Sequence, residues 1–394
     1  MKKISIIGAG ASGLICAIFC ARNSLTVDLY EQNSKIAKKI LVSGNGRCNI
    51  TNTKLSKDDY FSEKPSFVQY ALDTFGYDEF SKFCNSIGLM LEVKDDAKVY
   101  PLSNEAKSVV TLLEAEAKKL GVNILVDTKI TDIKKLLKDS ACVVVATGSQ
   151  AASHLGGNDD GLEFAKTFGH KLTPSYPSLV QFEVNNKIFK KMAGAKVSGE
   201  VKLIINNKPS ISKSGDILFT AYGLSGFSIL DISQSASFAM LNSKKVQVSL
   251  DLLPSFTKEE LILHIKNNSH NLSIIDILSG VMPSKIARGV LEHLRIELNN
   301  KSLTSNLSKK IAQTTKAWIF DIDNTHGYRH AEVAGGGVNV GEINPKTMQS
   351  LKQKNLYFCG EVLDVVGKRG GYNFAFAWAS GFVAAKDIIR NVKI

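Results

Sequence analysis

The sequence predicts an α/β protein built on a parallel sheet, and three stretches of the chain support that prediction. The first is an apolar run at 4–7 that leads into a glycine-rich turn and a helical pattern. The second is the apolar run at 142–145, which ends in the small-residue turn Ala146-Thr147-Gly148. The third is the run at 356–359, which is followed by another glycine-rich turn and a helix. Buried strands that end in small-residue turns are typical of a parallel sheet with a ligand at its carboxyl edge.

The first glycine-rich turn has the sequence Gly8-Ala9-Gly10-Ala11-Ser12-Gly13. In a βαβ nucleotide site, Gly8 makes the tight turn and Gly10 lets the backbone approach a pyrophosphate. Gly13 lets the helix and the strand pack closely. The helix expected from Leu14 to Ala21 presents free amide groups and a positive dipole end to the phosphates. These features predict a Rossmann-like dinucleotide site.

A second expected strand, at 26–30, ends on Glu31. Its carboxylate is placed to accept a hydrogen bond from a ribose 2′-OH, which disfavours a 2′-phosphate. Two alternatives to a nucleotide site stay open. The basic start Lys2-Lys3 before an apolar stretch imitates a signal peptide, although glycines interrupt the stretch and no convincing cleavage site follows. A glycine-rich turn without a ligand is the second alternative.

Composition indicates an ordinary globular protein of two or three domains: 394 residues, 44% hydrophobic and 22% charged. No apolar run reaches the roughly 18 residues of a membrane helix, so we expect a soluble, cytoplasmic protein with no membrane partner. The net charge of +12 raises the hypothesis of a nucleic-acid partner. The lysines are scattered without a basic, aromatic-laced stripe, which favours a solvated basic surface and makes a nucleic-acid partner unexpected.

The cysteines show no CxxC pair and no metal-ligand spacing. We therefore expect buried, reduced thiols. The six are Cys16, Cys20, Cys48, Cys84, Cys142 and Cys359. None of the seven histidines has ligand spacing to another, so no metal site is expected.

Further elements follow in order along the chain. The small and polar residues of 38–52 predict a loop that runs along a bound cofactor. We expect helices within 65–90, a short hairpin at 93–101, a helix that Asn104 caps and that ends at Leu120, a strand at 122–126 and a helix at 162–168.

The predicted secondary structure changes in the middle of the chain. From Leu179 to Leu253 short alternating strands predict an antiparallel barrel or sheet, and from Phe256 to about Gln313 the pattern is helical. Strand signals return at 318–322. Near the end, Gly360-Glu361 closes a strand, and Gly370-Gly371-Tyr372-Asn373 opens a helix to about Ile389. The N- and C-terminal parts of one sheet would thus both bind one extended cofactor.

Four segments together resemble a known family. They are 8–13, the stretch Ser43–Asn52, Leu218–Gly226, and Gly360–Asp364 with Gly370–Phe374. On these residues the chain resembles the BaiN-like (HI-type) bacterial NAD(P)/FAD-dependent oxidoreductases, which include aminoacetone-oxidase-like flavoproteins and a dehydro-bile-acid reductase. The chain departs from the usual family pattern in a short linker between the strands at 122–126 and 143–145, in Phe227, which replaces a proline, and in the cations Lys368-Arg369.

The resemblance implies noncovalent FAD and a discontinuous FAD-binding domain at 1–178 and 335–394. It implies an inserted antiparallel β barrel-like domain at 179–254 and 314–334, and a small helical insert at 255–313. The residues expected to bind the cofactor are Gly8, Gly10, Ala11, Ser12, Gly13, Glu31, Gln32, Lys39, Gly44, Asn45, Arg47, Cys48, Ala146, Thr147, Gly148, Gly360, Glu361, Asp364, Gly370, Gly371, Tyr372 and Asn373.

A substrate is expected between the FAD-binding domain and the inserted domains. The residues predicted to line it are Arg47, Asn49, Tyr100 and Tyr222. Arg47 would anchor an anionic group or orient a carbonyl, and either tyrosine would donate a proton opposite the hydride. The alternative for the tyrosines is a place in the core with satisfied hydroxyls.

The predicted function is hydride transfer from NAD(P)H through FAD to a small organic acceptor, such as an enone-type double bond. No second Gly-x-Gly-x-x-Gly unit follows the first, so a nicotinamide donor would dock transiently over the flavin. The first alternative is an oxidase in which a small amine or ketone substrate reduces FAD and oxygen reoxidises it. The second is a flavin-bearing RNA-binding protein, which only the charge of +12 encourages.

Overall fold

The structure, a computed structural model, describes residues 3–300 and 304–392. Residues 1–2, 301–303 and 393–394 of the predicted domains therefore lie outside the described residues. The chain divides into two compact units. The first unit comprises Met1–Ser175 and Val333–Ile394, and the second comprises Tyr176–Glu332. The predicted domain boundaries are not tested by this division and stay predictions.

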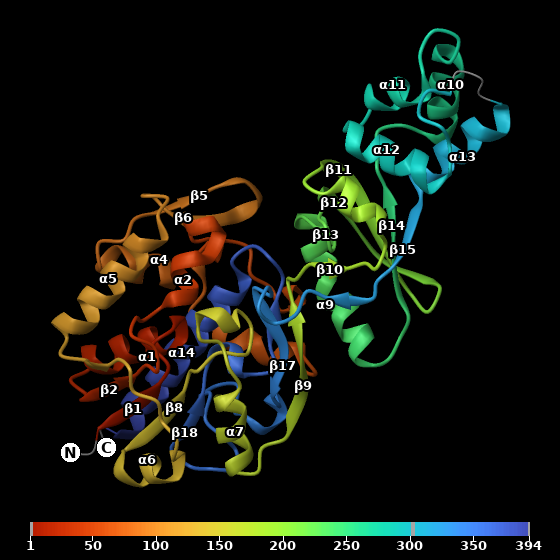
Figure 1. The fold of residues 1–394 in the computed structure, drawn as a ribbon. Coiled ribbons are helices and arrows are strands. Elements are labelled where there is room, and N and C mark those ends of the chain that lie inside the picture. Colours follow the sequence, from red (N-terminus) through yellow and green to blue (C-terminus); the bar gives the residue numbers. More distant parts are fainter. Residues whose placement is uncertain (1–2, 301–303, 393–394) are drawn as a thin grey trace. The chain divides into compact units, whose positions relative to one another are not determined.

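The first unit is organised around a five-stranded parallel sheet with the order β18-β8-β1-β2-β7 (Figure 1). Its strands are β1 (Ile4–Ile7), β2 (Val27–Tyr30), β7 (Asn123–Leu125), β8 (Cys142–Val145) and β18 (Leu356–Phe358). The register pairs Ile7 with both Tyr30 and Val145, so the carboxyl ends of β1, β2 and β8 meet at one edge. The predicted parallel sheet and the α/β class are confirmed.

Helices of the first unit cover the sheet. They are α1 (Ala11–Arg22), α2 (Lys38–Val42), α3 (Gln69–Thr74), α4 (Tyr77–Ser86), α5 (Ala106–Lys119), α6 (Ile133–Asp139), α7 (Asp160–Thr167) and α14 (Tyr372–Val392). The last helix of the chain packs directly on the first, because Gly381 of α14 lies against the backbone of Ser12 in α1. The two ends of the chain therefore build one nucleotide-binding layer, as the sequence predicts.

Short strands complete the first unit, and one predicted cap is wrong. The strands are β3 (Thr51–Asn52), β4 (Tyr60–Phe61), β5 (Leu91–Val93), β6 (Lys98–Pro101), β17 (Val333–Val338), β19 (Val366–Gly367) and the first part of β9 (Leu172–Ser178), which continues into the second unit. The predicted hairpin near 93–101 is the antiparallel pair β5–β6. Asn104 does not cap α5: the residue before the helix is Glu105, and Asn104 has a left-handed φ of 55°.

The second unit contains a seven-stranded sheet with the order β15-β14-β11-β12-β13-β10-β16. Its strands are β10 (Phe182–Glu183), β11 (Lys196–Ile205), β12 (Lys208–Phe219), β13 (Gly223–Ser225), β14 (Val246–Asp251), β15 (Trp318–Asp321) and β16 (Asn324–Thr325). Their pairings are antiparallel, as predicted. Within the described chain β15 and β16 form the two edges, so the sheet is open and not a closed barrel.

Two helices interrupt the stretch that the sequence predicts as strands only. These are α8 (Ile188–Met192) and the longer α9 (Phe227–Leu241), which packs on β11 and β12. Ser228, Ser233 and Ser237 of α9 are buried together with its isoleucines. The accessible face of α9 carries the exposed apolar residues Phe227, Phe238 and Leu241, so the apolar residues of its sequence do not mark one buried face with the helical period.

The helical stretch is confirmed and comprises α10 (Lys258–Asn268), α11 (Ile274–Ser279), α12 (Ser284–His293) and α13 (Ser305–Lys316). Thr257 begins α10 with a capping box, in which its hydroxyl accepts the Glu260 amide and Glu260 accepts the Thr257 amide. Ser273 and Thr304 cap α11 and α13, because each hydroxyl accepts a backbone amide from the first turn of its helix. One hydrophobic core joins these helices to the sheet of the second unit. No helix among the described residues is both long and apolar enough to cross a bilayer.

Candidate functional site

The turn after β1 has the geometry that a dinucleotide site requires. Gly8 has φ +104°, and a Cβ there would lie 2.4 Å from the carbonyl oxygen of Ala146. A Cβ on Gly13 would lie 1.9 Å from the carbonyl oxygen of Gly8, so the helix and the strand approach as closely as predicted. At Gly10, by contrast, an added Cβ meets no atom within 4 Å. Gly10 is the N-cap of α1 and has no capping side chain, so the helix start faces open space.

The side chain of Ser12 is turned away from this open space. Ser12 is buried, and its hydroxyl donates to the carbonyl oxygen of Cys359 at 3.4 Å. Any contact between Ser12 and a phosphate would come from its backbone amide. The hydroxyl joins the first and last parts of the sheet instead.

Glu31 lies at the carboxyl end of β2 and is 9% exposed. Its Oε2 accepts the amide of Ala9 at 3.1 Å, and its Oε1 accepts the backbone amide and the side-chain amide of Asn33 at 2.9 and 2.6 Å. These bonds orient the carboxylate beside the glycine-rich turn. Oε2 accepts only one of these bonds, so this oxygen retains acceptor capacity for a ribose hydroxyl.

The turn after β8 borders the same edge of the sheet. Ala146 is buried, whereas Thr147 and Gly148 are partly exposed. An added Cβ on Gly148 also meets no atom within 4 Å. The Thr147 hydroxyl is buried and has no hydrogen-bond partner, and it occupies the space that a Cβ on Gly161 would need. Gly10 and Gly148, on the turns after two neighbouring strands, thus both face unfilled space.

Lys39 and Glu361, both predicted cofactor residues, meet although 322 positions separate them. The Lys39 ammonium lies 3.0 Å from Oε2 of Glu361. The Oε1 atom accepts the hydroxyl of Ser149 at 2.6 Å and the amide of Ala334 at 2.9 Å. The nearby Gln32 donates its side-chain amide to the carbonyl of Gly156 at 2.9 Å. Glu361 therefore has a defined orientation at the end of β18.

Asp364 is 3% exposed and holds the chain after Glu361 in place. Its Oδ2 accepts the amide of Glu63 at 3.1 Å and the hydroxyl of Thr173 at 3.2 Å. Burial raises the pKa of the Asp364 carboxyl above its ordinary value, and these hydrogen bonds oppose the shift. Asp364 and Gly360 are both buried and shape the turn, and their contacts with a cofactor stay predictions.

The glycine-rich turn before α14 is held by the side chain of Asn373. That amide accepts the Gly367 amide at 2.8 Å and donates to the Gly367 carbonyl at 2.9 Å. Gly371 has φ +94°, and a Cβ there would lie 2.3 Å from the carbonyl oxygen of Thr51. Gly371 and the first residues of α14, from Tyr372 on, are partly exposed. Lys368 is exposed and pairs with Asp59 at 2.9 Å, so its ammonium group lies at the surface.

The loop at 43–52 presents an exposed tip. Gly44 and Asn45 both adopt left-handed backbone angles, with φ 55° and 56°. Arg47 is exposed, and its Nε lies 3.4 Å from the Gly44 carbonyl. Cys48 is 0% exposed and its side chain packs in the hydrophobic core, and its contact with a cofactor stays a prediction. Burial raises the pKa of its thiol to about 11, which keeps the thiol protonated.

Of the four residues predicted to line a substrate, three lie in the first unit. Tyr100 packs beside the glycine tip, because a Cβ on Gly44 would lie 3.8 Å from its ring. Asn49 is partly buried behind the same tip. Tyr222 belongs to the second unit, where burial raises the pKa of its hydroxyl and its ring stacks on His326. Their roles toward a substrate stay predictions.

The buried-thiol prediction is confirmed for all six cysteines. In the part of the chain that the structure describes, no group of three or more His, Cys, Asp or Glu side chains has the arrangement of a metal site.

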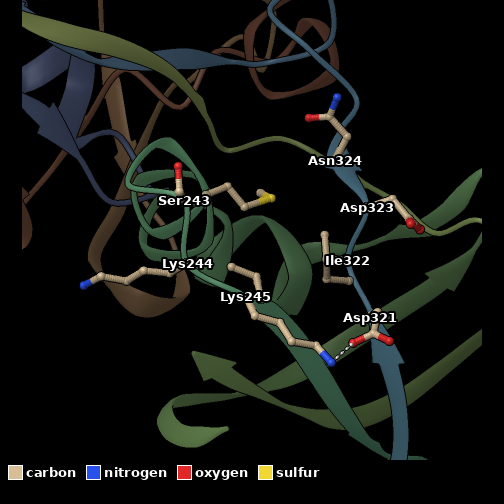
Figure 2. Close-up of a pocket in the computed structure, with 9 residues that line it drawn as sticks. Ser243, Lys244, Lys245, Asp321, Ile322, Asp323 and Asn324 are labelled. Atoms are coloured by element: carbon tan, nitrogen blue, oxygen red, sulfur yellow. Dashed lines mark ion pairs between the residues drawn. The ribbon is translucent and has the colours of Figure 1, made fainter. Parts of the chain in front are cut away.

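A groove in the second unit contains none of the predicted site residues (Figure 2). It has a volume of about 590 Å³ and is lined by Met240, Ser243–Val246 and Asp321–Asn324. Lys245 and Asp321 form an ion pair of 3.1 Å along it (Figure 2). The sequence pattern carries no signal for this groove, because its two sides come from segments about 75 residues apart.

The first unit fits FAD on observations of its own. Unfilled space in front of Gly10 and Gly148 suits a pyrophosphate beside the start of α1. Glu31 lies on the ribose side, and Glu361 with Lys39 lies at the end of β18, two strands from β1. The partly exposed start of α14 supplies amide groups at a second helix N-terminus.

A family model, the HI0933-like protein Rossmann domain, matches residues 2–387. The chain belongs to the HI0933-like Rossmann family. This membership confirms the resemblance predicted from the motifs, and with it the assignment as an FAD-dependent oxidoreductase. Three relatives match this HI0933-like chain over 98% of its length.

The first relative is the 3-dehydro-bile acid delta(4,6)-reductase of Clostridium scindens, which is 33% identical over 98% of its own length. The other two are named ribosomal RNA dihydrouridine synthase. The protein from Haemophilus influenzae is 31% identical over 98% of its length, and the protein from Escherichia coli is 30% identical over 97%. These names say what the relatives do.

Proposed function

We propose that this protein reduces a carbon–carbon double bond conjugated to a carbonyl group, with NAD(P)H as the hydride donor and FAD as the carrier. The observation that carries the proposal is similarity over nearly the whole chain to proteins that are named for two such reductions. A 3-oxo bile acid with Δ4 and Δ6 double bonds is an extended enone. Uracil also has a double bond conjugated to a carbonyl, and its saturation makes dihydrouridine.

FAD supplies two-electron hydride chemistry when it is bound, and the protein supplies binding, orientation and electrostatics. In the proposed site the amides at the start of α1 hold the pyrophosphate, and Glu31 holds the adenosine ribose. Glu361, oriented by Lys39 and Ser149, accepts a hydroxyl of the cofactor chain. The amides at the start of α14 face the flavin.

A nicotinamide donor would dock only transiently. The chain has no second Gly-x-Gly-x-x-Gly unit to hold a dinucleotide permanently. Arg47, exposed at the glycine tip, supplies a positive charge for an anionic group of a donor or an acceptor.

A nucleic-acid acceptor is now the second candidate, although the sequence makes it unexpected. Two of the three relatives carry names that specify ribosomal RNA. The net charge of +12 favours association with a polyanion. The small enone and the RNA base share one bond type, so both fall within the proposed reaction.

The test begins with the purified holoenzyme under anaerobic conditions. NADH or NADPH should bleach the flavin absorbance in a stopped-flow instrument. The reduced enzyme is then mixed separately with a 3-oxo-4-ene steroid, with unmodified ribosomal RNA and with buffer that contains oxygen. Rapid return of the absorbance with the steroid or the RNA supports the proposal and identifies the acceptor.

An outcome in which neither nicotinamide reduces the flavin would overturn the proposed donor. Reoxidation by oxygen alone, with no response to either conjugated acceptor, would overturn the reductase and support the oxidase alternative. Mass spectrometry of the product, with a gain of two hydrogens, is the independent check.

A further inference from the structure

We propose that Tyr222, His326 and His330 of the second unit form a stacking site for a nucleobase. The inference rests on the proposed function for its choice of ligands: the base belongs either to an RNA substrate or to the adenine of NAD(P)H. No residue of the predicted cofactor cradle takes part. Only Tyr222 has a predicted role, and that role concerns its hydroxyl and not its ring.

The three rings form a continuous stack. The centroids of Tyr222 and His326 are 3.9 Å apart and their planes differ by 4°. His330 follows at 4.1 Å from His326 with an interplanar angle of 30°. His326 is the middle member, since it contacts both other rings. Such spacing matches the distance at which aromatic rings and bases stack on each other.

The middle ring is fixed by the sheet. Nδ1 of His326 lies 2.8 Å from Oε1 of Glu183, and the backbone amide of His326 donates to the carbonyl of Gln181 at 2.8 Å. Glu183 lies on β10, which pairs with β13 on one side and β16 on the other. The strand that orients His326 therefore also holds the segment after Tyr222. A stack that is held before binding loses little entropy when a base is added.

The stack does not belong to the hydrophobic core of the second unit. None of its three rings is among the core residues, His330 is exposed, and Tyr222 and His326 are partly exposed. Arg329, the neighbour of His330, is also exposed. A flat ring beside a cation is the combination that proteins use for single-stranded nucleic acid: the ring stacks on the base and the cation faces the phosphate.

Two probes distinguish whether the stacked base belongs to RNA or to the nicotinamide dinucleotide. The first is a fluorescently labelled single-stranded oligouridylate, whose binding to the holoenzyme is measured by fluorescence anisotropy. The second is NADP⁺ or NAD⁺, whose binding is measured by calorimetry without turnover. His330→Ala should raise the dissociation constant of the true ligand about 5- to 150-fold, as expected for the loss of one stacking contact.

Further variants distinguish stacking by the aromatic rings from any effect of side-chain charge. His330→Trp should keep or tighten binding, and Tyr222→Phe should leave binding unchanged because the ring is preserved. His270→Ala removes an exposed histidine elsewhere in the same unit and should have no effect. Tyr222→Leu is the second stacking variant, with its fold checked by circular dichroism.

Weaker binding of the oligouridylate in His330→Ala and Tyr222→Leu supports the site and assigns it to RNA. Weaker binding of the dinucleotide alone supports the site and assigns it to the nicotinamide donor. Unchanged binding of both probes in both variants overturns the inference. Flavin reduction and turnover are measured separately, so a failure of the proposed reaction does not imitate a failure of the stacking site.

Discussion

Gly10 and Gly13 lie three residues apart at the start of α1, yet an added Cβ would meet opposite surroundings at the two positions. At Gly13 the Cβ would lie 1.9 Å from the Gly8 carbonyl oxygen, whereas at Gly10 it would meet no atom within 4 Å. The requirement for glycine at position 13 therefore comes from packing of the protein itself. Packing sets no such requirement at position 10, and we propose that a ligand in the open space sets it instead.

Gly10→Val should therefore remove FAD without unfolding the protein. The backbone at Gly10 is extended, with φ −85°, which valine also adopts. We expect the free energy of unfolding of the apoprotein to change by less than about 1 kcal/mol, while FAD occupancy falls sharply. Gly13→Ala is the matched contrast, with a loss of about 1–3 kcal/mol of stability from overpacking. Full FAD content in a folded Gly10→Val protein would contradict the assignment of this turn.

His170 is a second position where burial decides the chemistry. Its Nε2 lies 2.7 Å from the hydroxyl of Ser350, and Nδ1 lies 3.3 Å from Oε2 of Glu342 in a poor geometry for a hydrogen bond. Burial lowers the pKa of the imidazole, and Lys352 adds to the shift while Glu342 opposes it. The neutral ring is thus favoured in the folded state.

A lowered pKa in the folded state means that the unfolded chain binds the extra proton first as the pH falls. Stability from the neutral His170 is present above the unfolded pKa of about 6.5 and is lost below it, by up to about 1.4 kcal/mol per pH unit. His170→Gln should make the melting temperature less sensitive to pH between about 7 and about 5.5. Equal slopes in differential scanning fluorimetry for the two proteins would contradict this account.

At the scale of elements, the start of α14 is defined by its contacts with distant segments. Gly371 lies against the carbonyl of Thr51 in β3, and the Asn373 amide is bonded to Gly367. The side chain of Asn373 therefore shapes the turn, and we expect backbone amides to supply positive potential toward a flavin. The Lys368 ammonium pairs with Asp59 and is directed to the surface.

These contacts predict different effects for two variants of that turn. Lys368→Ala should leave the reduction potential of bound flavin unchanged, because an exposed, paired charge is screened by solvent. Gly371→Ala should cost at least about 1 kcal/mol of stability, because alanine is strained at φ +94° and its Cβ meets Thr51. Spectroelectrochemistry and chemical denaturation check the two expectations. A clear fall in potential for Lys368→Ala would show that its charge reaches the flavin.

At the scale of the whole molecule, the chain combines a cofactor-binding unit at both ends with an inserted second unit. The net charge of +12 is a property of the entire surface and of no single motif. Such a charge strengthens the binding of a polyanion through counterion release. It has almost no effect on the binding of a neutral steroid.

Salt should therefore distinguish the two classes of acceptor. If about three phosphates are neutralised, affinity for single-stranded RNA should fall roughly 20-fold between about 50 and about 200 mM salt. Affinity for a neutral 3-oxo-4-ene steroid should stay within about twofold over the same range. Anisotropy and flavin absorbance titrations measure the two constants. A salt-independent RNA affinity would exclude the scattered lysines as its source.

The sequence by itself determined the βαβ unit at 4–31, the strand ends at 146–148 and 360–361, and the family. These features are local: strand hydrophobicity, glycine spacing and the position of an acid can each be read within about 30 residues. The helical stretch was equally predictable, because Ser and Thr caps such as Thr257 and Ser273 mark the helix starts.

Only the tertiary structure decided which distant residues meet and which helix lies inside the strand region. The pairs Lys39–Glu361 and Tyr222–His326 join segments that have no common spacing, so no pattern in the chain predicts them. Helix α9 buries serines and exposes Phe227, Phe238 and Leu241, so its sequence lacks the polar face that would reveal its period. Cys48 lies in a motif that predicts ligand contact, and only the packing of the chain shows that its side chain is buried. Burial is a property of the folded chain, and the local sequence does not reveal it at these positions.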